Sequence, residues 1–405
     1  MRRAAVGLLL AAAGVVATAA PRLLDFTADE RAAILAHGPW PPPLVRDPAN
    51  ALEGRPEAIA FGRRLFHDRR LSADGRVACA SCHVPATGFT DRRRTAQARQ
   101  DEGPRNTPTL WDVAQQRWFG WGGATDSLWA ASMVPMLATG EMAHTVPALA
   151  ARVRAAPDLA AGWRRAHGRE IPADDEAVVV GLAKALAAWQ ATLVSPRTAF
   201  DEFRDALARG DVRAAAQYPL AAQRGLRLFV GEARCSVCHS GPRFSNGEFG
   251  DVGVPFFVPA AQGGGVDSGR HAGLLALQRS RLTRLGPHHD GDAAADPRAL
   301  LTRQLTMEPR HFGEFRVPGL RQLLHTAPYW HDGSAATLGA VVRHYSLLDE
   351  DRLHADGERI LRRLNLSPRQ VADLEAFLRT LSTPAASPPP APAQRAMASP
   401  STHTR

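Results

Sequence analysis

Two five-residue segments constrain this chain more than any other feature. Cys79-Ala-Ser-Cys82-His83 and Cys235-Ser-Val-Cys238-His239 have the spacing that attaches a c-type haem through two thioether bonds, with the following His as an iron ligand. Together they use all 4 cysteines. A zinc site is disfavoured because the two pairs lie far apart, and a dithiol redox centre leaves both His residues unexplained. The sequence therefore predicts two covalently bound haems c.

The N-terminus has the layout of a secretory signal peptide. Arg2 and Arg3 precede an apolar run over residues 4–16, and Ala17-Thr18-Ala19 has the small residues of a cleavage site. The run is short for a membrane span, and an uncleaved anchor is the alternative. Covalent haem attachment and an export signal are consistent with the same location. We therefore expect a signal peptide over residues 1–19 and a mature protein in a bacterial periplasm, without stable membrane insertion.

The chain is basic and rich in arginine. Its formal net charge of +9 is compatible with nucleic acid or with an acidic protein as a partner. The run Arg92-Arg93-Arg94 is short and has no interleaved aromatic residues, so a solvated surface is the simpler interpretation. An exported haem protein rarely meets nucleic acid. We expect no nucleic-acid partner, and an acidic protein partner stays open.

An internal duplication accompanies the haem motifs. Gly62-Arg-Arg-Leu-Phe66 precedes the first motif and Gly225-Leu-Arg-Leu-Phe229 precedes the second, so a G-x-R-L-F element recurs with each haem. Each unit also closes with a predicted helix, one between Asp174 and Pro196 and one that starts at Ser367. Few stretches alternate between apolar and polar residues as strands do, so the sequence predicts a mainly α fold.

With 405 residues the chain has room for two domains of ordinary size. We predict two cytochrome c-like domains that face each other, an N-terminal domain over residues 57–210 and a C-terminal domain over residues 211–383. Residues 20–56 form an extension rich in Pro and Ala. The tail over residues 384–405, rich in Pro, Ala and Ser, need not fold.

From about residue 57 to 382 the chain resembles the bacterial di-haem cytochrome c peroxidase family, which includes the MauG-type enzymes. Besides the haem motifs, the likeness rests on Pro104-Arg-Asn106-Thr-Pro-Thr, Trp121-Gly-Gly, Glu141-Met142 and Thr326-Ala-Pro-Tyr-Trp-His-Asp-Gly-Ser334, in this order. The resemblance implies an oxidoreductase in which the N-terminal haem reacts with hydrogen peroxide and the C-terminal haem stores or relays electrons. It also implies a Trp and a calcium ion between the haems.

The first haem is predicted to keep an open iron position. The sequence has no His between His83 and His144, whereas conventional peroxidases of the family place a His soon after the first motif, where it caps the resting iron until the enzyme is reduced. Met133, Met136 and Met142 are alternative caps, although Met more often packs in a core. We expect an iron with one protein ligand, or with bound water, that needs no reductive activation.

The resemblance implies a distal pocket around Glu141 and Pro135. Heterolysis of a bound peroxide needs a group that moves a proton from the inner to the outer oxygen, and desolvation raises the pKa of a carboxyl group in such a pocket. Glu141 matches the family's distal glutamate in its position relative to Trp121 and Pro135, and a surface carboxylate is the alternative. Ala131 stands where the family commonly has a Gln, so a hydrogen-bond donor is absent.

The resemblance also implies the residues between the haems. Trp121 matches the bridging residue, where an indole offers a stepping site for an electron hole, and a core Trp is the alternative. The side chain of Asn106 and the backbone carbonyls of Thr326 and Pro328 match the calcium site, and hard oxygen ligands suit this ion. Asn106 could instead cap a turn.

The second iron, bound by His239, is predicted to take Tyr345 as its distal ligand. Conventional peroxidases use a Met, but the sequence has none between Met307 and Met397. Tyr345 stands at the matching position, as in MauG-type enzymes, and a tyrosinate lowers the potential and stabilises iron at a high oxidation state. A core Tyr is one alternative. The competing ligands are His344, Met307 and Tyr329.

The sequence therefore predicts a periplasmic di-haem peroxidase of MauG type, which reduces hydrogen peroxide and oxidises a protein through a high-valent di-haem state. The reductant would be a small cytochrome, a cupredoxin or a partner side chain that becomes modified. One alternative is a conventional cytochrome c peroxidase. The other is a di-haem cytochrome that only transfers electrons, in which both irons are six-coordinate.

Overall fold

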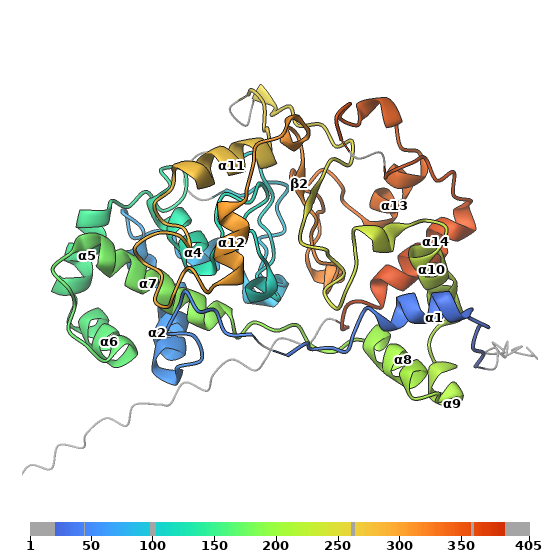
Figure 1. The fold of residues 1–405 in the computed structure, drawn as a ribbon, viewed down its shortest axis with the longest axis horizontal. Helices are drawn as coiled ribbons and strands as arrows, with labels where there is room; N and C mark the ends of the chain where they lie inside the picture. The colour runs from blue at the N-terminus through green and yellow to red at the C-terminus, as the bar shows by residue number, and fades with distance from the viewer. Residues whose placement is uncertain (1–20, 44, 98–102, 261–263, 358–359, 385–405) are drawn as a thin grey trace, which may run out of the picture.

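The computed structural model describes residues 21–43, 45–97, 103–260, 264–357 and 360–384. This part of the chain is mainly helical (Figure 1), as predicted. Strands β1 (Phe249–Gly250) and β2 (Phe315–Arg316) pair antiparallel. Among the described residues, no helix combines the length and the hydropathy needed to cross a membrane. The predicted signal peptide and the tail beyond residue 384 lie outside the described residues.

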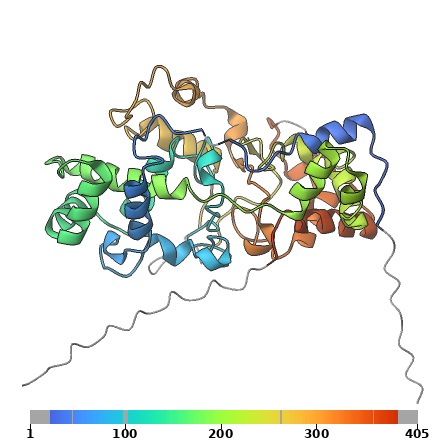
Figure 2. The ribbon, with the colours of Figure 1, turned by 90° about the horizontal axis from the view of Figure 1, so that it is seen from below.

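The helices gather in two lobes, which Figures 1 and 2 show side by side. The first lobe holds α2 (Pro56–Phe66), α3 (Cys79–Cys82), α4 (Leu128–Leu137), α5 (Val146–Ala155), α6 (Pro157–His167) and α7 (Asp175–Gln190). The second holds α1 (Ala28–Leu35), α8 (Ala199–Ala208), α9 (Val212–Ala215), α10 (Leu220–Val230), α13 (Leu338–Ser346) and α14 (Pro368–Arg379). Further helices are α11 (Arg270–Arg279) and α12 (Pro297–Arg303), and short 3₁₀ helices cover Arg69–Leu71, Pro85–Thr87, Val113–Gln115, Cys235–Val237, Pro309–His311, Leu323–His325 and Glu350–Arg352.

Each lobe has its own hydrophobic core. In the first, α7 is apolar on almost every side, as a helix enclosed by others must be, and it packs against α2, α4 and α5. In the second, α10 packs along α14, and aromatic rings of Phe200, Phe229, Phe244 and Phe377 contact one another. Because α2 and α10 each lead through a loop into a haem motif, the two cores position the two motifs.

The recurring glycine of the G-x-R-L-F element lets the helices of each core cross closely. A Cβ atom at Gly62 of α2 would overlap the carbonyl oxygen of Ala185 in α7. In the same way, a Cβ atom at Gly225 of α10 would overlap the carbonyl oxygen of Asp373 in α14. A larger residue at either glycine would push the helices apart. The sequence duplication is therefore a duplicated helix crossing.

The duplication extends to the helices α4 and α13. Each begins after an N-cap hydroxyl group and follows a turn closed by an isolated β-bridge. The N-caps are Ser127 and Thr337, and the bridges join Phe119 to Thr125 and Tyr329 to Ala335. Counted from these N-caps, Pro135 of α4 and Tyr345 of α13 occupy the same position.

Some segments pack in a different lobe from the segments next to them in sequence. The phenylalanines of α8 belong to the second core, and the segment over residues 270–303 contacts the first lobe through hydrogen bonds and ion pairs (Figures 1 and 2). The N-terminal extension contributes to both cores, with Ile34 in the second and Leu52 in the first. The division into residues 57–210 and 211–383 stays a prediction.

Candidate active site

The first haem motif forms a single helical turn, α3, that ends at His83. The His83 N–H donates to the carbonyl oxygen of Cys79 at 2.9 Å. Imidazole Nδ1 lies 3.1 Å from the carbonyl oxygen of Phe89, and because a carbonyl only accepts, Nδ1 must carry the proton. Nε2 is then the unprotonated nitrogen, which is the form that binds iron.

The second haem motif repeats this geometry. The His239 N–H donates to the carbonyl oxygen of Cys235 at 2.9 Å, and Nδ1 of His239 lies 2.9 Å from the carbonyl oxygen of Phe244. Burial lowers the pKa of both motif imidazoles, which favours their neutral form. The chain thus holds two imidazoles in the same tautomer, each beside a pair of cysteines.

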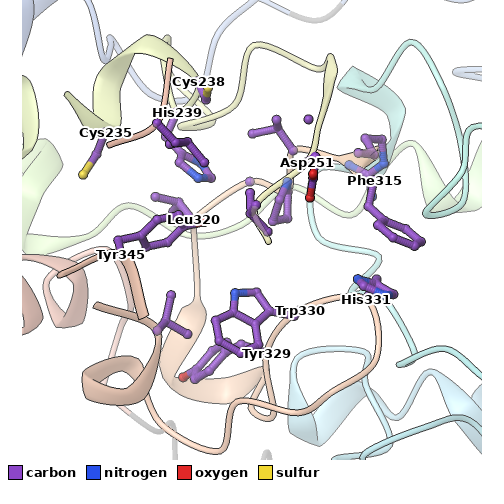
Figure 3. Close-up of a pocket in the computed structure, with 18 of the residues that line it drawn as sticks. Cys235, Cys238, His239, Asp251, Phe315, Leu320, Tyr329, Trp330, His331 and Tyr345 are labelled. Carbon is purple, nitrogen blue, oxygen red and sulfur yellow. The ribbon is translucent and has the colours of Figure 1, made fainter. Parts of the chain in front are cut away.

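A cavity of about 620 Å³ adjoins the second motif. Both cysteines of the motif and His239 line it, and its size is within the range of cofactor sites. Figure 3 shows His239 and Tyr345 projecting into it from different segments, with Tyr329 and Trp330 along one side. A cavity with two thiols and an imidazole on one wall fits a covalently attached haem.

Tyr345 is the best placed of the candidate ligands for the second iron. It lies on α13 and lines the cavity, and none of the hydrogen bonds among the described residues engages its hydroxyl group. His344 Nε2 lies 2.7 Å from a backbone carbonyl oxygen, and the Tyr329 hydroxyl donates to another at 3.0 Å. Met307 is not one of the residues that line the cavity. Burial raises the pKa of the Tyr345 phenol, so an iron that binds tyrosinate must displace its proton.

The corresponding helix of the first unit has no such ligand. Pro135 of α4 stands where α13 has Tyr345, and a proline side chain has no atom that binds iron. The alternative caps are buried in the first core, with exposed fractions of 2%, 0% and 2% for Met133, Met136 and Met142. This packing supports the prediction of an open iron position above His83.

Glu141 lies in the turn that follows α4. The Met142 N–H donates to the carbonyl oxygen of Pro135 at 3.1 Å, which ties this turn back to the helix. Burial raises the pKa of the Cys79 and Cys82 thiols, and the nearby Glu141 carboxylate adds to both shifts. The turn therefore brings Glu141 near the two cysteines of the first haem motif, and its catalytic role stays a prediction.

The Glu141 carboxyl group has an unusual environment for a side chain that solvent still reaches. The residue is exposed. Neighbouring protein atoms nevertheless desolvate the carboxyl group and raise its pKa, and desolvation is the cause of this shift. A carboxyl group of this kind holds its proton more tightly than an ordinary glutamate.

Trp121 lies where the two duplicated segments meet, and it lines the same cavity as His239. The Arg316 N–H donates to the carbonyl oxygen of Trp121 at 2.8 Å, and the Asn106 N–H donates to the carbonyl oxygen of His331 at 2.6 Å. Asn106 and Arg316 occupy matching positions in the two units, and so do Trp121 and His331. Each unit therefore donates the same hydrogen bond to the other. The Trp121 indole N–H donates to the carbonyl oxygen of Asn106 at 2.8 Å.

The three residues predicted to bind calcium also line this cavity. Asn106 Nδ2 donates to the carbonyl oxygen of Arg93 at 2.8 Å, so its amide oxygen faces away from that bond. Among the described residues, no hydrogen bond uses this amide oxygen or the carbonyl oxygens of Thr326 and Pro328. Oxygen atoms left without donors suit a hard cation.

Sequence reasoning did not single out two buried arginines of the cavity. Arg243 and Arg316 are 9% and 5% exposed, and both line the cavity. A signal for Arg316 existed, because Arg316-Val-Pro318 stands in the second unit where Asn106-Thr-Pro108 stands in the first. Recognising it required the correspondence between α4 and α13. Arg243 belongs to no recurring pattern that we identified.

Two equivalent haem-binding motifs on two helical cores define a di-haem c-type cytochrome. Residues 56–209 match the family described as di-haem cytochrome c peroxidase. The chain is 33% identical to the methylamine utilization protein MauG of Methylorubrum extorquens, over 90% of this chain and 88% of that protein. It is 32% identical to the cytochrome-c peroxidase IdrP1 of Denitromonas iodatirespirans, over 85% and 86%. The chain belongs to the di-haem cytochrome c peroxidase family.

Solved structures agree with this assignment. A MauG-like protein associated with microbial copper homeostasis shares 25% identity and a TM-score of 0.64, over 87% of this chain and 98% of that protein. The di-haem peroxidase BthA of Burkholderia thailandensis, at 21% identity and a TM-score of 0.64, shares the fold over 84% of this chain and 90% of that one. The predictions of two cytochrome c-like domains, two haems c and a peroxidase-type oxidoreductase are confirmed.

Proposed function

We propose that this protein is an exported di-haem peroxidase of MauG type in which the two haem sites have different tasks. Hydrogen peroxide reacts at the site of His83, and the site of His239 stores an oxidising equivalent. The observation that carries this proposal is the pair of corresponding positions on α4 and α13. Pro135 leaves the first iron open to peroxide, whereas Tyr345 offers the second iron an anionic oxygen ligand.

Glu141 handles the proton at the peroxide site. Iron, when bound there, supplies the redox chemistry that cleaves the O–O bond. The Glu141 carboxylate takes the proton from the inner oxygen of the peroxide and delivers it to the outer oxygen, which then leaves as water. Its raised pKa suits both steps, because the same group must accept and release a proton. Ala131 cannot donate a hydrogen bond, so this work depends on Glu141.

Trp121 connects the two sites. Its indole lies at the reciprocal backbone contact between the two units and lines the cavity of the second motif. This position supports its role as the bridge through which an oxidising equivalent is shared. Tyr345 would hold the second iron, and the negative charge of its deprotonated phenol would stabilise the oxidised form of that site.

The reductant is proposed to be an exported protein. The Methylorubrum relative is named for methylamine utilization and the Denitromonas relative for cytochrome c peroxidase activity. A partner side chain that becomes modified would suit the first type of relative. A small cytochrome or a cupredoxin would suit the second. The net charge of +9 favours an acidic partner. The signal-like residues 1–19 support a periplasmic location.

The resting ferric protein provides the test. We expect one high-spin and one low-spin haem signal in its electron paramagnetic resonance (EPR) spectrum, and we expect peroxide to change the optical spectrum without prior reduction. Two low-spin signals without any response to peroxide would identify an electron carrier. A response that appears only after reduction by one electron would identify a conventional peroxidase.

We also propose a calcium ion bound by the amide oxygen of Asn106 and the carbonyl oxygens of Thr326 and Pro328. We expect about one calcium per chain by elemental analysis, and we expect chelation to perturb the haem spectra reversibly. Asn106→Ala should lose the calcium. Asn246→Ala, which removes a side-chain acceptor for the Glu248 N–H, is the matched control and should keep it. A native protein without calcium, or an Asn106 variant that retains it, would contradict the proposal.

A further inference from the structure

His37, in the N-terminal extension, is buried in the second lobe against the loop that follows His239. Its ring is 2% exposed and stacks on the ring of Phe244, with 4.5 Å between the centroids and 8° between the planes. His37 Nδ1 lies 3.1 Å from the carbonyl oxygen of Gly241, so this nitrogen carries the proton. Neither His37 nor Phe244 lines the cavity beside the second motif, so a haem in that cavity does not come between them.

The loop that His37 contacts carries the hydrogen-bond acceptor of the second iron ligand. The carbonyl oxygen of Phe244 lies 2.9 Å from Nδ1 of His239. The Phe244 N–H in turn donates to the carbonyl oxygen of Gly241 at 2.9 Å. His37 therefore holds this turn at both ends, through the carbonyl group of Gly241 and through the ring of Phe244. Only Phe244 separates His37 from the imidazole that binds iron.

Phe244 depends on this support because of its backbone conformation. Its φ of +56° lies in the left-handed region, which a bulky residue rarely occupies. Such a conformation persists only where the surrounding structure holds it. Among the described residues, His37 is the one ring that stacks flat on Phe244. Three phenylalanines meet the same ring edge-on, namely Phe200, Phe229 and Phe377. Without His37, the Phe244 backbone can relax and turn its carbonyl group away from His239.

The first unit has the same acceptor but lacks this support. Phe89 has a φ of +59°, and its carbonyl oxygen accepts from Nδ1 of His83. Its aromatic neighbours all meet it edge-on, and they are Phe66, Trp111 and Trp189. Among the described residues, no ring stacks on Phe89. A change at His37 should therefore affect the second haem and spare the first.

We propose that His37 is a positioning residue that keeps the reduction potential of the second haem low, by holding the Phe244 carbonyl group on the imidazole of His239. An imidazole that donates from Nδ1 is a stronger ligand through Nε2 and favours ferric iron. Burial lowers the pKa of His37 to about 4, so its ring is neutral near pH 7 and acts through its position. The inference goes beyond the proposed function, because it holds whichever haem meets peroxide.

Redox titration of the haem-loaded protein, followed by EPR, tests this inference. His37→Ala removes the stacked ring and the hydrogen bond. We expect one of the two haem potentials to rise by about 59 mV, which is about a tenfold change in the equilibrium constant for reduction, and the other to stay unchanged. His37→Phe keeps a ring and loses only the N–H, so the same potential should rise by a smaller amount.

Hydrogen exchange read by mass spectrometry locates the change. In His37→Ala the backbone N–H groups of residues 244–246, which close the loop after His239, should exchange faster. The corresponding N–H groups of residues 89–90 in the first unit should exchange as in the wild type. Phe26→Ala is the matched control, because Phe26 belongs to the same extension but packs on Phe203. It should lower the thermal stability and leave both potentials unchanged.

Two outcomes would overturn the inference. One is a haem-loaded His37→Ala protein with both potentials at their wild-type values, or His37→Phe with this result if it is the only variant that folds. The other is an equal rise of both potentials, which would indicate a general loosening of the protein. A wild-type protein that does not react with peroxide would contradict the proposed function alone, because neither measurement uses peroxide.

Discussion

Glu141→Gln is expected to slow the oxidation of the haem sites by peroxide by about 10²–10⁴-fold while peroxide still binds. Glutamine preserves the size and polarity of the side chain but cannot carry the proton between the two peroxide oxygens. Stopped-flow absorbance over a range of peroxide concentrations separates binding from the later step. Only the later step should lose rate.

The dependence on pH provides an independent check. Because desolvation raises the Glu141 pKa, the carboxylate that accepts the peroxide proton forms only at a pH above the ordinary value of 4.5. In the wild type the rate should therefore rise with pH through this raised pKa, and in Glu141→Gln the rise should be absent. Glu57→Gln, on the exposed start of α2, is the control. A Glu141 variant with wild-type kinetics would place the acid-base role elsewhere.

Tyr345→Phe is expected to abolish the low-spin spectrum of the second haem and to leave the high-spin spectrum of the first nearly unchanged. Phenylalanine fills the same space on α13 but has no oxygen to bind the iron. Because tyrosinate stabilises the oxidised iron, its loss should also raise the potential of the second site. Optical and EPR spectra of the resting protein, with a redox titration, measure both effects.

Tyr329→Phe is the matched control. Tyr329 lines the same cavity, but its hydroxyl already donates to a backbone carbonyl at 3.0 Å. This variant should keep the low-spin spectrum. If Tyr345→Phe keeps it and Tyr329→Phe or a His344 variant loses it, the ligand has been assigned to the wrong side chain.

Short-range sequence patterns predicted much of this protein. The haem motifs were readable because thioether attachment requires a fixed spacing within one helical turn, and α3 has that turn. The G-x-R-L-F repeat marked a duplication, and the structure explains its glycine through the crossing of α2 with α7 and of α10 with α14. Glu141 could be placed near the first haem by resemblance, and its turn does lie beside Cys79 and Cys82.

Other features could not be read from the sequence. Whether Met133 caps an iron or packs in a core depends on which way α4 faces, and the structure buries it at 2% exposure. His344 and Tyr345 are neighbours in sequence, yet one is hydrogen-bonded to a backbone carbonyl and the other faces the cavity. The match of Arg316-Val-Pro318 to Asn106-Thr-Pro108 became recognisable only once the structure had aligned α4 with α13.

The sequence by itself determined the two haem motifs, the repeated G-x-R-L-F element and the family, because each depends on residues that are close along the chain or follow in a set order. The tertiary structure decided which side chains share one cavity. Only the packing of two units against each other sets Arg316 over Trp121 and aligns Pro135 with Tyr345. Such contacts join distant segments, so their distances and charges arise only when both cores have formed.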